Sequence, residues 1–296
     1  MTDRIVDLSE EPARLAVRNG LLTIGRDGGA EMTVPLGELG VLVVSHPQVT
    51  YTQAVLSGLA ESGGAFVTCN AARLPVGMLL PIDANYVQSE RFNAQAHAPL
   101  PVQKRVWQQI VRAKVMAQGA LLERLYGDDK GLANLAQKVR SGDPSNLEAQ
   151  ASRRYWLALF RDGEFRRDRE AEDQNRFLNY GYAVLRAIVA RAIVGAGLHP
   201  SLGVHHHNRY NGFCLADDLM EPLRPRVDSA VVDLVRARGA KAPLDREAKA
   251  ALIGAVAERV EVDGEARSIF EGASRLAGSL VAVLEGKRKR LLIPGI

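Results

Sequence analysis

The stretch that decides the interpretation of this chain reads Gly203-Val-His-His-His-Asn-Arg-Tyr-Asn-Gly-Phe-Cys-Leu-Ala-Asp-Asp-Leu-Met-Glu-Pro-Leu-Arg-Pro-Arg226. It holds three of the six histidines of the chain, together with three carboxylates and three arginines. Imidazole and carboxylate groups suit a divalent cation such as Mg²⁺, Mn²⁺ or Zn²⁺, and guanidinium groups suit phosphate oxygens. The stretch therefore predicts a metal site that faces a phosphodiester, although runs of histidines or charges are often only solvated.

Two carboxylates of this stretch, Asp218 and Glu221, lie three residues apart. One helical turn brings both to the same face, whether Pro222 ends that turn or kinks a longer helix. A histidine from residues 205–207 would have to reach them from the preceding loop, and the residues alone do not decide which one. A metal held by one histidine and one carboxylate would bind weakly, so we expect a further carboxylate from a distant segment.

Glu148 is the candidate for that further carboxylate. It also completes the pattern Ser145-x-x-Glu148, in which the glutamate of a capping box accepts from a backbone N–H at a helix start. The capping role is the simpler interpretation. In favour of a ligand role, Arg153 and Arg154 follow within two turns, before the helix becomes strongly apolar, so its first turn should emerge at a basic surface.

Charge is unevenly distributed along the 296 residues. Residues 1–95 contain six arginines, no lysine and ten acidic residues, a net charge of −4, whereas the rest of the chain contains 32 basic and 24 acidic residues, a net charge of +8. A basic surface beside the candidate site favours a polyanionic partner, most often nucleic acid, although many basic enzymes act on small substrates.

Cysteine content and hydropathy indicate the compartment. Two cysteines, Cys69 and Cys214, are too few for a disulfide framework, so we expect a reducing, cytoplasmic setting. The N-terminus lacks the basic-then-apolar layout of a signal peptide. Two arginines interrupt the most apolar run, residues 184–198, so we expect no membrane segment.

The hydrophobic pattern changes near Pro99 from short apolar runs with glycine and asparagine turns to helical spacing. Before this point we expect strands at 41–44 and 65–69, a hairpin at 15–26 with an Asn19-Gly20 turn, a helix at 52–62, and a proline-bounded connector from Leu74 to Pro81. After it we expect helices at 102–126, 184–194 and 248–260. The final segment, 285–296, is a basic run before an apolar tail; it is either a solvated terminus or a contact with DNA or a partner subunit.

The prediction is an α+β fold with a β-rich N-terminal domain, residues 1–90, a linker, 91–100, and an α-helical C-terminal domain, 101–296. The change of period and the −4/+8 charge partition place the boundary. We expect the acidic β-rich domain to serve dimerisation and partner docking, and the basic helical domain to hold DNA.

Several segments together carry a resemblance to a known family. They read Asn146-Leu-Glu-x-x-Ala-x-x-x-Tyr155, Leu178-Asn-Tyr-Gly-Tyr-Ala-Val-Leu185, Arg73-Leu-Pro-Val-Gly-Met-Leu-Leu-Pro81 and the part of the opening stretch that ends in Leu-Ala-Asp-Asp-Leu-Met-Glu-Pro-Leu-Arg-Pro225. In this combination the chain resembles the CRISPR-associated integrase/endonuclease that captures new spacers. The last segment and the compact length are most similar to the branch found in type II systems.

The resemblance implies a fold and an assembly. The N-terminal domain should be sandwich-like and the C-terminal, catalytic domain all-α. The protein should form a homodimer, and two such dimers should flank one dimer of the small second adaptation protein. Double-stranded prespacer DNA and CRISPR repeat DNA are the expected nucleic acids, and other type II CRISPR components are further candidate partners.

The resemblance also implies a site that binds Mg²⁺ or Mn²⁺. Glu148, His206 and Glu221 correspond to the metal ligands, and Asp218 is a nearby catalytic carboxylate that binds the metal directly or through water. His206 is chosen among its neighbours because its spacing to the Asp-Leu-Met-Glu-Pro turn matches the family pattern best. The expected reaction is attack by the 3′-hydroxyl of a prespacer end on a phosphodiester at the border of a repeat.

Four arginines are candidates for DNA contacts: Arg153, Arg154, Arg209 and Arg224. Arg224 is equally a candidate structural partner of Glu221. Two other functions are compatible with the residues, namely a non-catalytic DNA-binding subunit with a structural histidine–carboxylate cluster, and a mononuclear zinc hydrolase that acts on small substrates.

Overall fold

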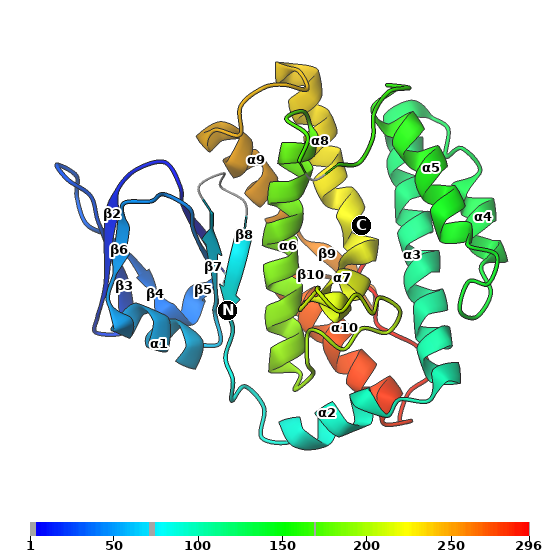
Figure 1. Cartoon of the computed structure of the whole chain (residues 1–296), viewed down its shortest axis with the longest axis horizontal. Helices are drawn as coiled ribbons and strands as arrows, with labels where there is room; N and C mark the ends of the chain where they lie inside the picture. Colours follow the sequence, from blue (N-terminus) through cyan, green and yellow to red (C-terminus); the bar gives the residue numbers. More distant parts are fainter. Residues whose placement is uncertain (1–3, 71–74, 169, 296) are drawn as a thin grey trace.

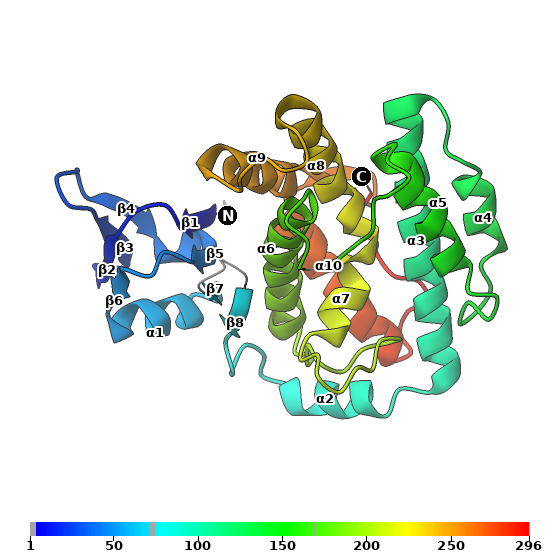
Figure 2. The ribbon, with the colours of Figure 1, turned by 45° about the horizontal axis from the view of Figure 1, so that its top comes forward.

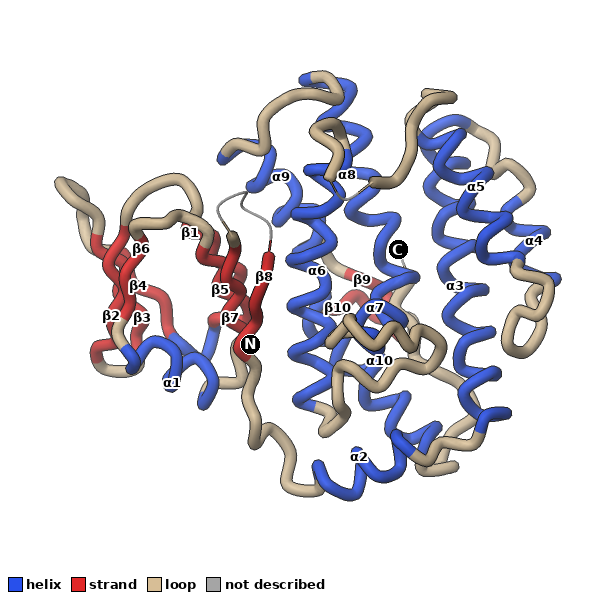
Figure 3. Tube along the Cα trace, in the orientation of Figure 1, coloured by secondary structure: helices blue, strands red, loops and turns tan. Residues whose placement is uncertain are grey.

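The computed structural model describes residues 4–70, 75–168 and 170–295, and divides them between a strand-rich part and a helical part (Figures 1 and 3). The strands of the first part are β1 (Arg4–Leu8), β2 (Ala13–Arg18), β3 (Leu21–Gly25), β4 (Met32–Pro35), β5 (Leu39–Val44), β6 (Val49–Tyr51), β7 (Ala65–Cys69) and β8 (Pro75–Leu79). A short helix η1 (Leu36–Glu38) and helix α1 (Gln53–Glu61) lie between them.

The strands form two four-stranded sheets, with the orders β1-β5-β7-β8 and β4-β3-β2-β6. The predicted hairpin is confirmed as β2–β3: Asn19 and Gly20 both have positive φ, as a type I′ turn requires. The predicted strands at 41–44 and 65–69 and the helix at 52–62 are confirmed as β5, β7 and α1.

The predicted connector at 74–81 is wrong where the structure describes it. Residues Pro75–Leu79 form β8, which pairs antiparallel with β7 at the edge of its sheet. An edge strand tolerates proline at its first position because no ladder hydrogen bond is needed there. Leu74 of this connector, and Arg73, which belongs to the segment quoted for the family resemblance, lie outside the described residues.

Strand β5 is buried on both faces, which ties the two parts together. Leu42 and Val44 point into the core between the two sheets, whereas Val41 and Val43 belong to the core formed with the helices. Successive side chains of a strand alternate between faces, so one continuous apolar strand serves both cores.

Most of the remaining chain is helical, and helix α6 runs between the strands and the other helices (Figures 1 and 2). The helices are α2 (Gln88–Ala96), α3 (Leu100–Tyr126), α4 (Leu132–Lys138), α5 (Leu147–Leu159), α6 (Asn175–Gly195), α7 (Cys214–Met220), η2 (Glu221–Leu223), α8 (Arg224–Arg238), α9 (Arg246–Ala257) and α10 (Ile269–Leu284). Helix α6 is long and apolar enough to span a membrane, but 78% of its most apolar window is buried inside the protein, as in a core helix.

The predicted α+β class, sandwich-like and then helical, is confirmed, with three amendments after residue 90. The helix predicted at 248–260 ends at Ala257, and β9 (Val260–Val262) pairs with β10 (Glu265–Arg267) in a small hairpin. The apolar tail is not a solvated terminus: Leu291 is buried, and its backbone N–H donates to Gln109 of α3. The predicted linker, 91–100, contains most of α2 and the first residue of α3. The functional division into domains stays a prediction.

Candidate active site

Glu148 lies in the first turn of α5, where a different residue caps the helix. The carboxylate of Asp143 accepts from the backbone N–H of Leu147 at 3.0 Å and from that of Glu148 at 2.9 Å. The capping box favoured from the sequence is therefore wrong, because the N–H of Glu148, which Ser145 would accept from in such a box, donates to Asp143 instead. The carboxylate of Glu148 is left to interact with another element.

That element is α3. The ammonium group of Lys114 forms an ion pair with Oε1 of Glu148 and lies 2.7 Å from Oε2 of Glu221. Lys114 is buried on α3, as are the apolar residues Ile110, Val111 and Val115 near it on the helix. Burial alone would lower the pKa of Lys114, but Glu221 and Glu148 outweigh it and raise the pKa above its ordinary value.

Glu221 begins the 3₁₀ turn η2 and is buried. Its Oε1 lies 2.9 Å from Nε of Arg224. Its Oε2 lies 2.7 Å from the ammonium group of Lys114, so each oxygen of this carboxylate contacts a cation. Burial would raise the pKa of Glu221, but Arg224 and then Lys114 lower it to about 2.

Asp218, fully buried on α7, holds the segment 203–213 that precedes this helix and carries the three adjacent histidines, here called the histidine loop. Its Oδ2 accepts from the backbone N–H groups of Val204 at 2.7 Å and His205 at 2.9 Å, and its Oδ1 lies 2.5 Å from Nδ1 of His206. The hydrogen bond to Asp218 raises the pKa of His206. The contacts assign Asp218 the role of holding the loop, while its direct binding of a metal stays a prediction.

Two further features fix this loop. The ring of His205 stacks on Trp107 of α3, with centroids 4.1 Å apart and the planes almost parallel. A Cβ on Gly203 would come within 2.2 Å of the carbonyl oxygen of His206, so the loop needs glycine there. His206 is thereby held with Nδ1 on Asp218, which leaves Nε2 for another contact.

The four arginines predicted to contact DNA fall into two groups. Arg153 and Arg154 on α5 and Arg209 in the histidine loop are exposed. Arg224 instead pairs with Glu221, and its guanidinium lies 4.6 Å from the ring centre of Tyr182. The contact with Glu221 that the sequence left open is thus present.

Next to this pair lies a cavity of about 180 Å³ whose lining includes three guanidinium groups. Arg224 lines it together with Arg186, which pairs with Asp217 at 2.7 Å, and Arg167. The remaining lining residues are Pro75, Asn179, Tyr182 and Ala183. Sequence reasoning missed this cavity, although the helical spacing of 179, 182, 183 and 186 marks one face of α6.

The donor set fits a hard divalent ion, although the described part of the chain holds no ready-made site. Within the described residues, no three His, Cys, Asp or Glu side chains lie close enough together to hold a metal. An ammonium group lies against both carboxylates instead. By the chemistry of their side chains, Glu148, Glu221 and His206 are the residues that could hold such an ion, since Mg²⁺ and Mn²⁺ take oxygen ligands and Mn²⁺ also takes imidazole nitrogen.

These features define a class: a two-part α+β protein with a buried carboxylate, Glu221, and a half-buried one, Glu148, beside a loop that carries three histidines. The family model for CRISPR-associated protein Cas1 matches residues 7–253. The chain is 35% identical to the CRISPR-associated endonuclease Cas1 of Neisseria meningitidis serogroup C (strain 8013), across 98% of this chain and 95% of that protein. The chain belongs to the Cas1 family, and the predicted resemblance is confirmed.

Solved structures share the fold at low sequence identity. A casposase bound to integration product is 18% identical with a TM-score of 0.78, and the match covers 97% of this chain and 92% of that one. A chain of a Cas6-RT-Cas1–Cas2 complex is 16% identical with a TM-score of 0.75, and the match covers 99% of this chain and 36% of that longer one.

Proposed function

We propose that this protein is a metal-dependent DNA endonuclease and integrase of CRISPR adaptation, which inserts prespacer DNA into the CRISPR array by transesterification. One observation carries the proposal: Glu148 and Glu221, from distant segments, meet at one cationic group beside the histidine loop. Membership of the Cas1 family and the endonuclease name of the Neisseria relative support it.

The residues of the chain have separate roles in this proposal. Glu148, Glu221 and Nε2 of His206 would hold Mg²⁺ or Mn²⁺, which when bound supplies positive charge to the phosphoryl group under attack. Asp218 keeps the Nδ1 proton of His206 in a hydrogen bond, so that Nε2 presents its lone pair. The apolar face of α3 excludes water behind the carboxylates.

DNA would be held mainly through its phosphates. The exposed Arg153, Arg154 and Arg209 are suited to backbone contacts, and the guanidinium-lined cavity of about 180 Å³ beside Glu221 has room for a phosphate group. Arg224 would contribute to this cavity while oriented by Glu221. Each lost phosphate contact should lower the salt dependence of binding by about one unit of slope.

The proposed assembly has two homodimers of this chain on one dimer of the small second adaptation protein. The fold shared with a Cas6-RT-Cas1–Cas2 complex supports such a partner. The acidic strand-rich part, residues 1–90, would serve dimerisation and docking, and the basic helical part would hold DNA. The two cysteines are free, in line with a reducing, cytoplasmic setting.

The test is integration by the purified protein. The protein, its small genomic partner, Mn²⁺ and a labelled prespacer are incubated with a repeat-containing plasmid. Joined product should form with wild type and with Glu123→Ala, an exposed control on α3, but not with Glu148→Ala or Glu221→Ala, nor in EDTA. Full joining by Glu221→Ala would show that this cluster is not the catalytic site, whereas DNA binding without joining by wild type would favour the non-catalytic DNA-binding alternative.

A further inference from the structure

Lys114 has the surroundings of a functional residue, not of a surface lysine. It is 8% exposed, and its ammonium is shared between Glu148 on α5 and Glu221 on η2. Burying a charge is costly unless it is paired, and here one lysine compensates two buried or half-buried carboxylates. Without it, those carboxylates would repel each other across a small space.

The charges around the carboxylates already balance. Glu148 and Glu221 carry two negative charges, and Lys114 and Arg224 carry two positive charges in direct contact with them. A divalent ion on the same two carboxylates would leave the group with an excess of two positive charges. Either the resident cations turn away as the ion enters, or new negative charge arrives with it.

Phosphate is the available source of negative charge. Arg224 faces both Glu221 and the guanidinium-lined cavity, so a phosphate in that cavity would be a second partner for it. The ammonium of Lys114 lies against both carboxylates, where an ion bound by them would also lie. A metal ion and Lys114 therefore compete for the same oxygens, whereas a metal ion and DNA support each other.

We infer that Lys114 is a positioning residue that holds Glu148 and Glu221 together in the metal-free protein and lowers their affinity for a divalent ion until DNA binds. The inference rests on the proposed function in so far as these carboxylates are the metal ligands. It assigns a role to a residue outside the predicted ligand set and makes the affinity for metal depend on bound phosphate.

The experiment measures metal affinity directly, without activity. Free Mn²⁺ is titrated by electron paramagnetic resonance with wild type, Lys114→Met, Lys114→Arg and the control Lys104→Met, whose lysine is exposed on the same helix. Methionine removes the charge at similar volume, so Mn²⁺ should bind on the order of tenfold more tightly. Lys114→Arg and Lys104→Met should bind as wild type does.

Thermal unfolding separates this role from a merely structural one. In EDTA, Lys114→Met should unfold at a lower temperature than wild type because the carboxylates repel, and Mn²⁺ should raise its midpoint by more than it raises that of wild type. An equal loss of stability with and without Mn²⁺, at unchanged Mn²⁺ affinity, would overturn the inference. If the methionine variant does not fold, Lys114→Gln keeps hydrogen-bond donors without charge and should show the same tighter binding.

Mn²⁺ affinity distinguishes a failure of the proposed metal site from a failure of the role inferred for Lys114. If Mn²⁺ binds wild type and Glu221→Ala equally, the metal site of the proposed function is wrong. If binding is lost in Glu221→Ala but is no tighter in Lys114→Met or Lys114→Gln, only the role of Lys114 is wrong. Phosphate dependence is read from a short duplex, which should bind wild type more tightly with Mn²⁺ than without it, while Glu221→Ala should show no such gain.

Discussion

At the scale of single residues, the candidate site depends on a buried side chain that would not contact DNA itself. Asp218 is fully buried, yet it fixes the backbone of the histidine loop and the orientation of His206. Residues that orient a metal-binding histidine commonly change metal affinity or activity by about 10- to 100-fold when they are replaced. Asp218 should therefore matter to the reaction without contacting DNA.

We predict that Asp218→Ala lowers integration by about 10- to 100-fold and leaves DNA affinity without metal almost unchanged. The backbone N–H groups of Val204 and His205 lose their acceptor, so the loop should also exchange amide hydrogen faster. The measurements are joining rate, DNA binding and hydrogen exchange. Asp233→Ala, an exposed control on α8, should behave as wild type, and protected loop amides in Asp218→Ala would contradict this role.

At the scale of elements, helices α5, α6 and α8 meet at one buried carboxylate. Asp228 of α8 accepts hydrogen bonds from the hydroxyl of Tyr155 on α5, at 2.6 Å, and from that of Tyr182 on α6. Burial raises the pKa of Asp228 to about 6, although the two hydroxyls act in the opposite direction. This contact joins the helix of Glu148 to the helix that follows Glu221.

The pH dependence of stability should follow from this carboxylate. Between about pH 4 and 6 the folded protein keeps a proton on Asp228 that the unfolded chain has lost, so the free energy of unfolding falls as pH rises through this window, by about 3 kcal/mol. In Asp228→Asn this fall should be absent. Relative to wild type, its unfolding midpoint should rise between pH 4.5 and 7.5, and parallel curves, as expected for the exposed Asp233→Asn, would contradict the prediction.

Close packing of α6 on α8 gives a second prediction at this scale. A Cβ on Gly181 would lie 2.4 Å from Cγ1 of Val227. Gly181→Ala should therefore lower the free energy of unfolding by about 1–3 kcal/mol, as overpacking does, despite the better helix propensity of alanine. Gly195→Ala, at the open end of α6, is the control and should be neutral or slightly stabilising; equal effects in chemical denaturation would refute the packing argument.

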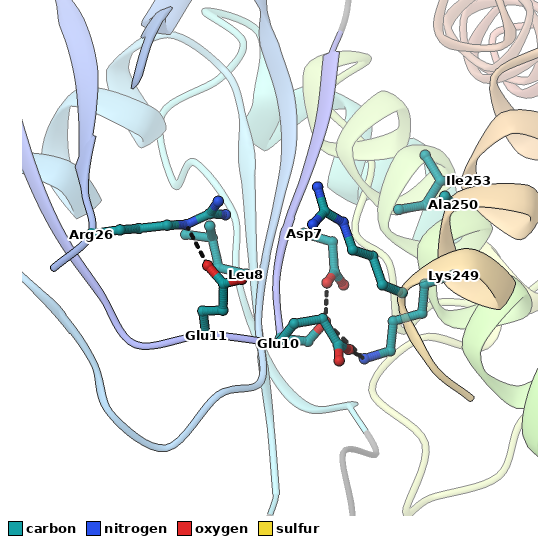
Figure 4. A pocket seen from close by; sticks show the side chains of 10 residues that line it. Asp7, Leu8, Glu10, Glu11, Arg26, Lys249, Ala250 and Ile253 are labelled. Atoms are coloured by element: carbon teal, nitrogen blue, oxygen red, sulfur yellow. Dashed lines mark hydrogen bonds and ion pairs between the residues drawn. The ribbon is translucent and has the colours of Figure 1, made fainter. Parts of the chain in front are cut away.

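At the scale of the whole molecule, polar contacts fix the strand-rich part to the helices. Figure 4 shows the cavity between β1 and α9, where the buried ammonium of Lys249 lies 2.8 Å from the hydroxyl of Ser9 and 2.5 Å from Oε1 of Glu10. Nearby, the hydroxyl of Tyr180 on α6 donates to Asp7 at 2.6 Å. Apolar packing is not directional, so these hydrogen bonds and ion pairs specify how the strand-rich part is oriented on the helices.

We predict that Lys249→Met lowers the unfolding midpoint and speeds hydrogen exchange in both β1 and α9. Removing the lysine leaves polar groups of Ser9 and Glu10 without a buried cation, which is costly. The exposed Lys241→Met should change neither observable. Exchange that speeds up in α9 alone would show that the contact does not join the two parts.

The sequence by itself determined whatever depends on neighbouring residues or on a repeated spacing. The Asn19-Gly20 turn, the apolar period of α3 and α6 and the family pattern around Glu148 and Glu221 are local properties. The structure bears out the turn and the helices, although α6 begins at Asn175, before the predicted residue 184, and the family model bears out the family. These signals succeed because backbone preference and hydrophobic periodicity act within a few residues.

The tertiary structure alone decided which distant groups meet. Lys114 contacts carboxylates that lie 34 residues away, in Glu148, and much farther along the chain, in Glu221, and no local pattern encodes this. Two other features that the sequence analysis missed are local by contrast: Asp143 instead of Ser145 caps α5, and Pro75–Leu79 pairs with the preceding strand β7. Ion pairing and close packing depend on three-dimensional distance, so the resident cation of the site could only emerge once α3, α5 and η2 were packed together.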